Sequence, residues 1–107
     1  MTRLPMKIEH DGNRMNISQI PELSAVNSTL FRDEVQASMP PTLHTLEIDL
    51  AQTVFVDSCG LGALFSLYKI TANGNSGVKL RLLNPAPQIQ QLFELTQMNQ
   101  FFEISKR

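Results

Sequence analysis

The chain has 107 residues, of which 42% are hydrophobic and 18% charged, and its formal net charge is −1. This length and composition are typical of one globular domain and exclude an intrinsically disordered chain. The charge balance, without any run of Lys or Arg, disfavours nonspecific binding to nucleic acid or to anionic membranes.

The first twenty residues have the pattern of a β-hairpin. Residues 6–10 and 14–20 alternate apolar and polar side chains, as half-buried strands do. Between them, Asp11-Gly12-Asn13 is a hairpin turn signal. We therefore expect two antiparallel strands that are neighbours in one sheet.

Residues 25–38 have the pattern of an amphipathic helix that lies on a sheet. Ser24 is a suitable N-cap, and Pro40 ends the helix because a proline disfavours helical backbone in the residue before it. The apolar half of the helical wheel contains Val26, Leu30, Phe31, Val35 and Ala37.

The central segment joins strand to helix through a short polar corner. Residues 43–50 alternate as a strand, and residues 53–56 form a β-branched and aromatic run. Asp57 and Ser58, both common N-cap types, follow that run. We expect the second helix from about residue 61 to residue 71.

The C-terminal third continues the pattern of strand and helix. Residues 78–83 predict a strand, a third helix starts at residues 84–87, where prolines suit the first turn, and residues 101–104 predict a short last strand. The second helix is apolar on more than one side, so we expect it to pack against the third. The side chains expected to be buried in the third helix are Ile89, Leu92, Phe93 and Thr96.

This order of elements predicts an α/β fold. Strands joined through helices imply parallel pairing with right-handed connections, and the first hairpin adds an antiparallel edge. We expect a mixed sheet of four or five strands with the helices packed largely on one side.

Nothing in the sequence indicates export or membrane insertion. No apolar stretch approaches the roughly 20 residues that a membrane helix needs. Residues 1–5 lack the apolar core of a signal peptide. The single cysteine, Cys59, cannot form an internal disulfide, which fits a reducing compartment. We expect a cytoplasmic protein.

The residues do not predict an enzyme. A hydrolase with Ser58 as nucleophile would need a glycine two residues earlier, where the chain has Val56, and a nearby histidine. Neither His10 nor His44 lies in a loop at the edge of the expected sheet where Ser58 lies. Two distant histidines and one cysteine lack the spacing of a metal site, and no nucleotide-binding motif is present. We expect no catalytic residue, no metal and no cofactor.

Ser58 has two readings on spacing alone. Its hydroxyl stands at a helix start, where the unpaired N–H groups and the helix dipole tolerate a phosphate, so it could accept a modification. It could equally serve only as the N-cap of the helix. The residues themselves leave both open.

The segments Ile48-Asp49-Leu50 and Phe55-Val56-Asp57-Ser58-Cys59-Gly60-Leu61-Gly62 form one motif, and Leu82-Leu83-Asn84-Pro85, Ile89 and Leu92-Phe93-Glu94-Leu95 follow it. The motif resembles the signature of STAS domains, in particular stand-alone anti-sigma-factor antagonists, and the later residues resemble the last strand and helix of that family. The resemblance covers residues 6 to 104, so we expect residues 1–107 to form a single STAS domain.

The resemblance implies a phosphorylation-switched binding module that is not itself an enzyme. An anti-sigma factor serine kinase would phosphorylate Ser58, and a metal-dependent serine phosphatase would remove the phosphate. The unphosphorylated protein would bind the anti-sigma factor and release its sigma factor. Asp57 would orient the corner or help to dock the kinase, and Gly60 and Gly62 would let the partner's backbone approach closely.

The chain departs from the family pattern at two positions. Ser24 stands where the family often has an aspartate before its first helix, and Cys59 replaces a small serine or alanine; we interpret Cys59 as a small filler rather than a redox sensor. An alternative function is a fixed STAS subunit of a larger assembly, such as a lipid-transport ATPase or a stress-sensing complex. The residues expected to bind a partner are Ser24, Asp57, Ser58, Cys59, Gly60, Leu61, Gly62, Ser66 and Lys69.

Overall fold

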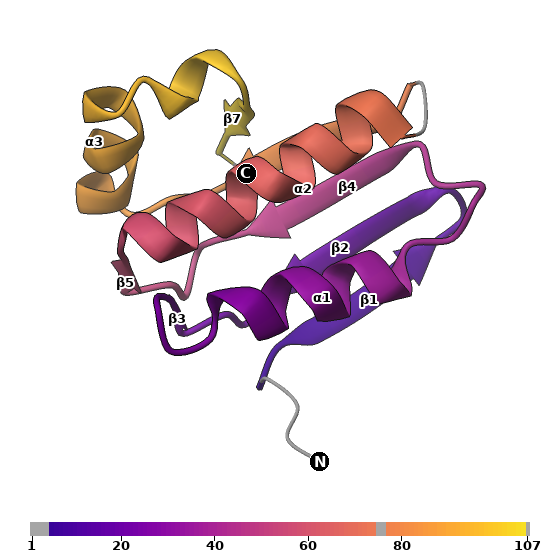
Figure 1. The fold of residues 1–107 in the computed structure, drawn as a ribbon, viewed down its shortest axis with the longest axis horizontal. Helices are drawn as coiled ribbons and strands as arrows, with labels where there is room; N and C mark the ends of the chain where they lie inside the picture. Colours follow the sequence, from indigo (N-terminus) through magenta and orange to yellow (C-terminus); the bar gives the residue numbers. More distant parts are fainter. Residues whose placement is uncertain (1–4, 75–76, 107) are drawn as a thin grey trace.

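A mixed five-stranded sheet carries the other elements (Figure 1). The computed structural model describes residues 5–74 and 77–106, and the side chains of residues 72–74 lie outside that description. Across the sheet the strands are β1 (Lys7–Asp11), β2 (Arg14–Ser18), β4 (Thr45–Asp49), β6 (Lys79–Leu83) and β7 (Glu103–Ser105). The pair β1–β2 is antiparallel and every other pair is parallel, which confirms the predicted hairpin and the mixed sheet.

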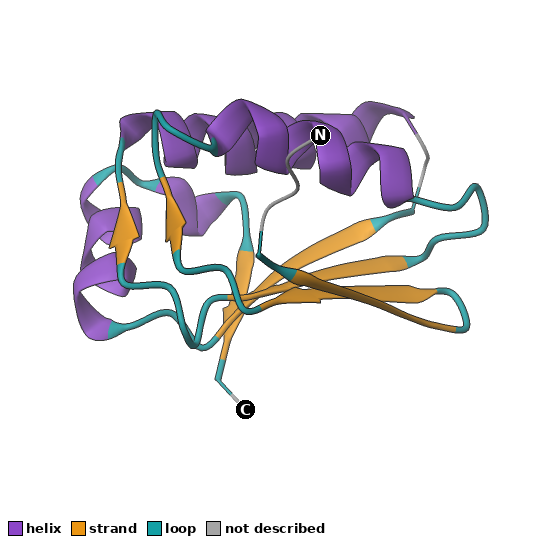
Figure 2. Ribbon diagram, turned by 90° about the horizontal axis from the view of Figure 1, so that it is seen from below, coloured by secondary structure: helices purple, strands orange, loops and turns teal. Residues whose placement is uncertain are grey.

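The helices lie on one side of this sheet, as the sequence predicts (Figure 2). Helices α1 (Ser28–Ser38) and α2 (Ser58–Gly74) run side by side over the strands. Helix α3 (Pro87–Leu95) and the short 3-10 helix η1 (Met98–Gln100) follow β6 and lead into β7. The opposite face of the sheet carries charged side chains, among them the buried Glu47, whose carboxylate pairs with Arg81 at 3.0 Å.

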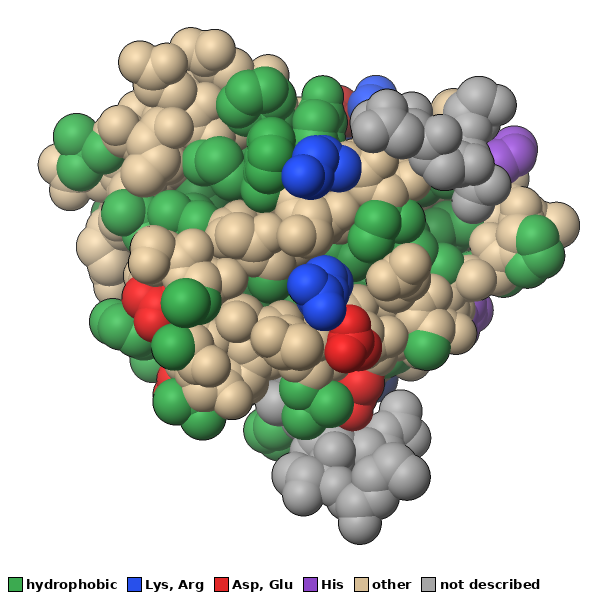
Figure 3. Space-filling view, in the orientation of Figure 1, with side chains coloured by type: hydrophobic (Ala, Val, Ile, Leu, Met, Phe, Trp, Pro, Cys, Tyr) green, Lys and Arg blue, Asp and Glu red, His purple; other side chains and the backbone are tan. Residues whose placement is uncertain are grey.

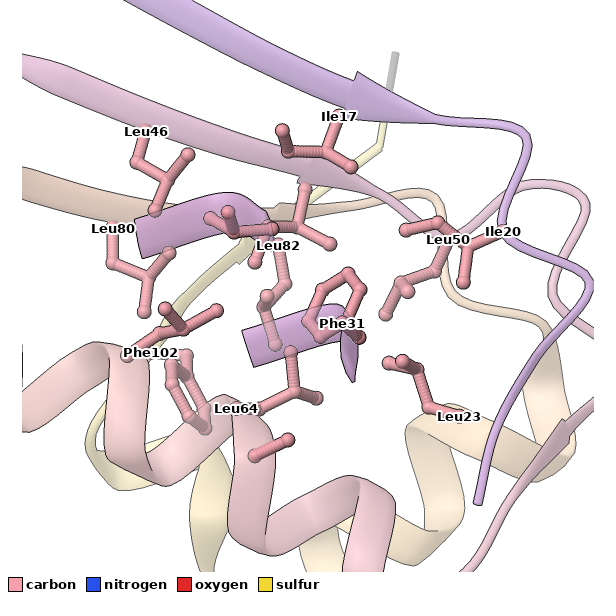
Figure 4. Packing of buried hydrophobic residues seen from close by; sticks show 14 of the residues in the cluster. Ile17, Ile20, Leu23, Phe31, Leu46, Leu50, Leu64, Leu80, Leu82 and Phe102 are labelled. Carbon is pink, nitrogen blue, oxygen red and sulfur yellow. The ribbon is translucent and has the colours of Figure 1, made fainter. Parts of the chain in front are cut away.

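The hydrophobic core lies between the sheet and the two long helices. Ile17, Ile48 and Leu82 are register partners on β2, β4 and β6, and all three are fully buried. From the helix side, Phe31 of α1 and Leu64 of α2 point into the same cluster (Figure 4). Burying a side chain of this size stabilises a fold by roughly 1.5–3 kcal/mol. The packing between the strands and the helices therefore fixes the position of α2 on the sheet.

A second sheet, separate from the main one, consists of two strands of two residues each. Strand β3 (Glu22–Leu23) pairs in parallel with β5 (Phe55–Val56), so the chain after β2 runs alongside the chain before α2. Gly60, in the first turn of α2, meets the backbone of Leu23 at this point. A Cβ on Gly60 would overlap the Leu23 carbonyl oxygen and lie 2.7 Å from the carbonyl carbon.

Helix α1 differs from its prediction at its N-terminal end. It begins at Ser28 and its N-cap position is Asn27, so the prediction that Ser24 caps the helix is wrong. Residues 24–27 instead form a turn, in which the Ser24 carbonyl accepts hydrogen bonds from the N–H groups of Asn27 and Ser28. The turn places Val26 outside the helical wheel, and this side chain is 90% exposed. Leu30 and Ala37 are also exposed, against expectation.

Three further predictions need correction. Helix α2 begins at Ser58, three residues earlier than expected, because Asp57 supplies its cap. It lies beside α1 rather than α3, and its other flank meets the rings of Phe101 and Phe102 through Tyr68. Thr96 is exposed at the end of α3, where its hydroxyl donates to the Leu92 carbonyl.

The two glycines of the first two turns of α2 give a matched prediction. Gly60→Ala should destabilise the protein by roughly 1–3 kcal/mol, because the added methyl group collides with backbone that cannot rotate away. Gly62→Ala should stabilise it by about 0.5–1 kcal/mol, because its Cβ meets open space and alanine is the better helix former. Urea unfolding followed by circular dichroism measures both changes. Equal effects of the two substitutions would contradict the packing described for Gly60.

Candidate functional site at the start of helix α2

Asp57 caps helix α2. Its Oδ1 accepts a hydrogen bond from the Gly60 N–H at 2.9 Å, and its carbonyl accepts one from the Leu61 N–H at 3.0 Å. An N-cap side chain bonded to the third helical residue satisfies one of the N–H groups that a helix start leaves unpaired. The cap that the sequence could assign to Asp57 or to Ser58 therefore belongs to Asp57.

Ser58 is the first residue of the helix, and its side chain is exposed. Within the described part of the chain its hydroxyl has no hydrogen-bond partner, so it contributes nothing visible to the cap. The reading of Ser58 as only an N-cap is wrong. A hydroxyl in this position is open to solvent and to any enzyme that can reach a helix start.

Asp57 also joins the helix start to the turn before α1. Its Oδ2 accepts a hydrogen bond from the Ala25 N–H at 3.0 Å, and its own N–H donates to the Leu23 carbonyl at 3.1 Å. The turn is closed from the other side by Glu22, whose carboxylate accepts from the Ser24 hydroxyl at 2.6 Å. The side chain of Asn27 donates to the Glu22 carbonyl at 2.8 Å. One carboxylate thus spans two segments that are 32 residues apart in sequence.

The N–H groups of Gly60 and Ala25 stabilise the ionised form of Asp57. The hydrogen bond from Gly60, and after it the one from Ala25, lowers the pKa of Asp57 below its ordinary 3.8. Both bonds favour the ionised carboxylate. The corner therefore carries a full negative charge next to Ser58 at neutral pH.

The structure divides the predicted partner-binding residues by exposure. Ser58, Cys59, Gly62 and Lys69 are exposed, Asp57 and Ser66 are half-buried, and Ser24, Gly60 and Leu61 are buried. The expected role of Gly60 in admitting a partner's backbone is wrong, because the chain's own Leu23 backbone occupies that space. Gly62 does face open space, as expected. Lys69 holds its ammonium 5.4 Å from the centre of the Phe65 ring.

A shallow groove of about 290 Å³ runs between α1 and α2, on the face that Figure 3 shows. Three of the predicted residues, Cys59, Gly62 and Ser66, lie along its α2 side. The residues on the α1 side of the groove were not predicted. Counted from the first of them, the others follow at one and four residues along the polar half of the predicted helix, and this spacing is a signal that the sequence does contain. The α1 residues of the groove are Ser28, Thr29 and Arg32.

Exposed apolar side chains lie close to the same corner. Val54 is 73% exposed and Phe55, the first residue of β5, is 53% exposed, and both lie within three residues of Asp57 in sequence. Val26 projects from the turn that Asp57 holds. Figure 3 shows hydrophobic and acidic side chains together at the end of the molecule where β3 and β5 lie. Exposed apolar groups next to polar ones are typical of a protein-binding surface.

Comparison with known proteins identifies the fold and the family. The model of the STAS domain matches residues 5–107. The chain belongs to the STAS domain family. The resemblance seen in the sequence is confirmed.

Solved structures of anti-sigma factor antagonists share the STAS fold with this chain. An anti-sigma-factor antagonist (STAS) domain protein from Planctomyces limnophilus is 16% identical, with a TM-score of 0.81 over 99% of this chain and 93% of that chain. SpoIIAA of Bacillus in its unphosphorylated form is 19% identical, with a TM-score of 0.71 over 92% of this chain and 86% of that chain. SpoIIAA has also been solved in its phosphorylated form. At these identities the likeness concerns the fold.

A third relative is a much longer protein. Prestin of Meriones unguiculatus is 36% identical to this STAS domain over 80 residues, which are 73% of this chain. The chain spans about a tenth of the length of prestin, since the matched part is 10% of that protein. Among the residues that the structure describes, no helix is long and apolar enough to cross a membrane. The same residues contain no group of three or more His, Cys, Asp and Glu side chains placed to hold a metal ion.

The cap predicts how stability depends on pH. Asp57→Asn should be less stable than the wild type at neutral pH, because an amide cannot accept both N–H groups as a carboxylate does. A lowered pKa in the folded state means that ionised Asp57 adds stability above its unfolded pKa, and this stability is lost as the pH falls from about 5 through the lowered value. The difference between the two proteins should therefore shrink in acid, as urea unfolding at a series of pH values will measure.

Ser58→Ala is the matched control for this measurement. Its hydroxyl bonds no described group, so the variant should keep the stability of the wild type and the same dependence on pH. A loss of stability in Ser58→Ala equal to that in Asp57→Asn would assign the cap to the wrong residue.

Proposed function

We propose that this STAS domain is a phosphorylation-switched antagonist of an anti-sigma factor. With Ser58 unmodified it binds an anti-sigma factor serine kinase in the cytoplasm and so releases the sigma factor. Phosphorylation of Ser58 ends the binding, and a serine phosphatase restores it. The observation that carries the proposal is the exposed Ser58 hydroxyl, left unbonded within the described residues because Asp57 performs the capping.

The helix start suits the modification itself. The Ser58 Oγ would attack the γ-phosphorus of ATP; the new O–P bond forms as the bond to the β,γ-bridging oxygen breaks, ADP leaves, and the serine proton passes to a base of the kinase. The helix dipole favours the resulting anion by roughly 0.3–1 kcal/mol at an exposed site. The fold can therefore accept the phosphate.

The surroundings of Ser58 explain how a phosphate would change binding. Val54 and Phe55 are exposed and lie within four residues of Ser58 in sequence, so a partner that covers them also approaches Ser58. A phosphate adds about two negative charges, which must be desolvated or faced by the partner. Juxtaposing like charges at an interface costs several kcal/mol, and about 3 kcal/mol is more than a hundredfold in affinity. This is sufficient for release.

Phosphorylation can be tested directly. Incubation of the purified protein with Mg-ATP and the anti-sigma factor kinases of its source organism should add one phosphoryl group, about 80 Da by intact mass. Ser58→Ala should gain no mass, and it should hold the kinase in co-purification where Ser58→Asp does not. A mass gain that persists in Ser58→Ala, or equal retention of the kinase by both variants, would refute the switch.

The groove between α1 and α2 gives a second prediction, for the extent of the partner surface. Ser66→Glu should weaken binding of the kinase by tenfold or more, because it places a charge in the groove beside Gly62. Lys69→Glu should weaken it too if the surface extends one turn further. Gln91→Glu, which adds the same charge on the exposed face of α3, is the control. Titration calorimetry measures the affinity of each variant for the kinase. If Ser66→Glu binds as tightly as the wild type and Gln91→Glu, the groove is not part of the interface.

A fixed structural role is the alternative, and the likeness to prestin favours it. Prestin carries its matched segment within a far longer chain. If this chain is likewise a fixed part of a larger assembly, Ser58 need never be modified. In that case the kinases would leave Ser58 unmodified, and Ser58→Asp would co-purify with the same proteins as the wild type. The two experiments above therefore separate the alternatives.

A further inference from the structure

The turn of residues 24–27 is held to the helix start by Asp57. Within the turn, the Ser24 N–H donates to the Asn27 side chain at 2.9 Å and the Val26 N–H to the Ser24 hydroxyl at 3.3 Å. These bonds fix its shape. Its attachment to α2 passes through the hydrogen bond from the Ala25 N–H to the Asp57 Oδ2.

A phosphate on Ser58 would act on this attachment at short range. It would stand one residue from a carboxylate that is already ionised, and it would add about two negative charges there. Repulsion between the two anions opposes the present position of the Asp57 side chain. Oδ1 is held within the first turn of α2 by Gly60, so the bond to Ala25, in a separate segment, is the more easily lost.

The two segments that form the corner carry no basic side chain. Residues 15–31 and 50–68 contain no Lys, Arg or His. The nearest cations in sequence already have partners, since Arg32 pairs with Asp33 at 3.0 Å and Lys69 lies over the ring of Phe65. Arg32 lines the same groove as Cys59 but pairs with Asp33, so the segments that hold Asp57 add no positive charge of their own.

From this geometry we infer that Asp57 couples the modification of Ser58 to the turn of residues 24–27: the phosphate displaces the Asp57 carboxylate from the Ala25 N–H and frees the turn. The inference rests on the proposed function, in which Ser58 is phosphorylated. Neighbouring contacts confine the response to the turn. Leu23 is fully buried and keeps its backbone bond to the Asp57 N–H, whereas Val26 is 90% exposed and has little packing to lose.

The consequence is a switch with two parts. The phosphate changes the charge at Ser58, and it also releases Val26, one of the exposed apolar side chains beside the corner. Asp57 acts as a positioning residue for this part of the surface. A partner that contacts the turn would sense the modification even where it does not touch Ser58.

The test needs neither the kinase nor a partner. Phosphoserine is incorporated at position 58 during translation, and amide hydrogen exchange is measured by NMR on 15N-labelled protein with and without the phosphate. Exchange of the Ala25 amide should become about tenfold faster, the factor expected when a hydrogen bond to a charged group is lost. The Val54 amide, which donates to the Pro21 carbonyl at the same end of the molecule, should not change.

The variant Asp57→Asn provides the second arm. Without the carboxylate charge, phosphoserine at position 58 should leave the exchange of the Ala25 amide as it is in unphosphorylated Asp57→Asn. An Ala25 amide that exchanges at the same rate in wild-type protein with and without the phosphate would overturn the inference, and so would an equal acceleration in Asp57→Asn. Neither result bears on whether a kinase modifies Ser58, so failure here and failure of the proposed function remain distinguishable.

Discussion

The candidate site depends on one carboxylate that is shared between two segments of the chain. Asp57 accepts an N–H from the first turn of α2 and another from the turn before α1. Because Asp57 bonds Gly60, the Ser58 hydroxyl has no capping role and remains accessible at the helix start. The bond to Ala25 brings the approach to α1 into the same surface. Besides Asp57, the pairing of β3 with β5 and the packing of α1 against α2 join the two halves of the site.

Much of the fold follows from local sequence pattern, and the errors lie where distant contacts decide. Alternation in β2 and β4 places Ile17 and Ile48 in the core, and the structure confirms it. The start of α1 was misplaced because residues 25–27 have acceptable helical composition. Their turn is stabilised by Glu22 and Asp57, and the contact with Asp57, 32 residues from Ala25, leaves no periodic trace in the sequence.

The sequence predicted the residues on the α2 side of the groove but not those on the α1 side. Ser58, Gly62 and Ser66 follow a helical spacing along α2; Gly62 and Ser66 do line the groove, and Ser58 is exposed at the start of the helix. Arg32, across the groove, lies on the polar half of the predicted first helix, but assigning it to the site required knowing that α1 is the neighbour of α2. The apolar character of α2 suggested α3 instead. Gly60 is the other instance: a glycine in a functional motif invites a functional reading, yet here its missing side chain makes room for Leu23.

The STAS fold by itself does not separate a switch from a fixed subunit, because a fold supports function only through the site placed on it. Two features of this chain bear on the distinction. A fixed subunit has no need of a serine that is both exposed and unbonded within the described residues, since at the first position of a helix many residues serve equally well. Nor does it need apolar side chains such as Phe55 to remain exposed beside that serine, unless another part of the assembly covers them. A reversible partner uses both features, because it must bury the apolar surface when bound and be repelled when the serine is charged. The combination of the two features at one helix start therefore favours a switch over a fixed subunit.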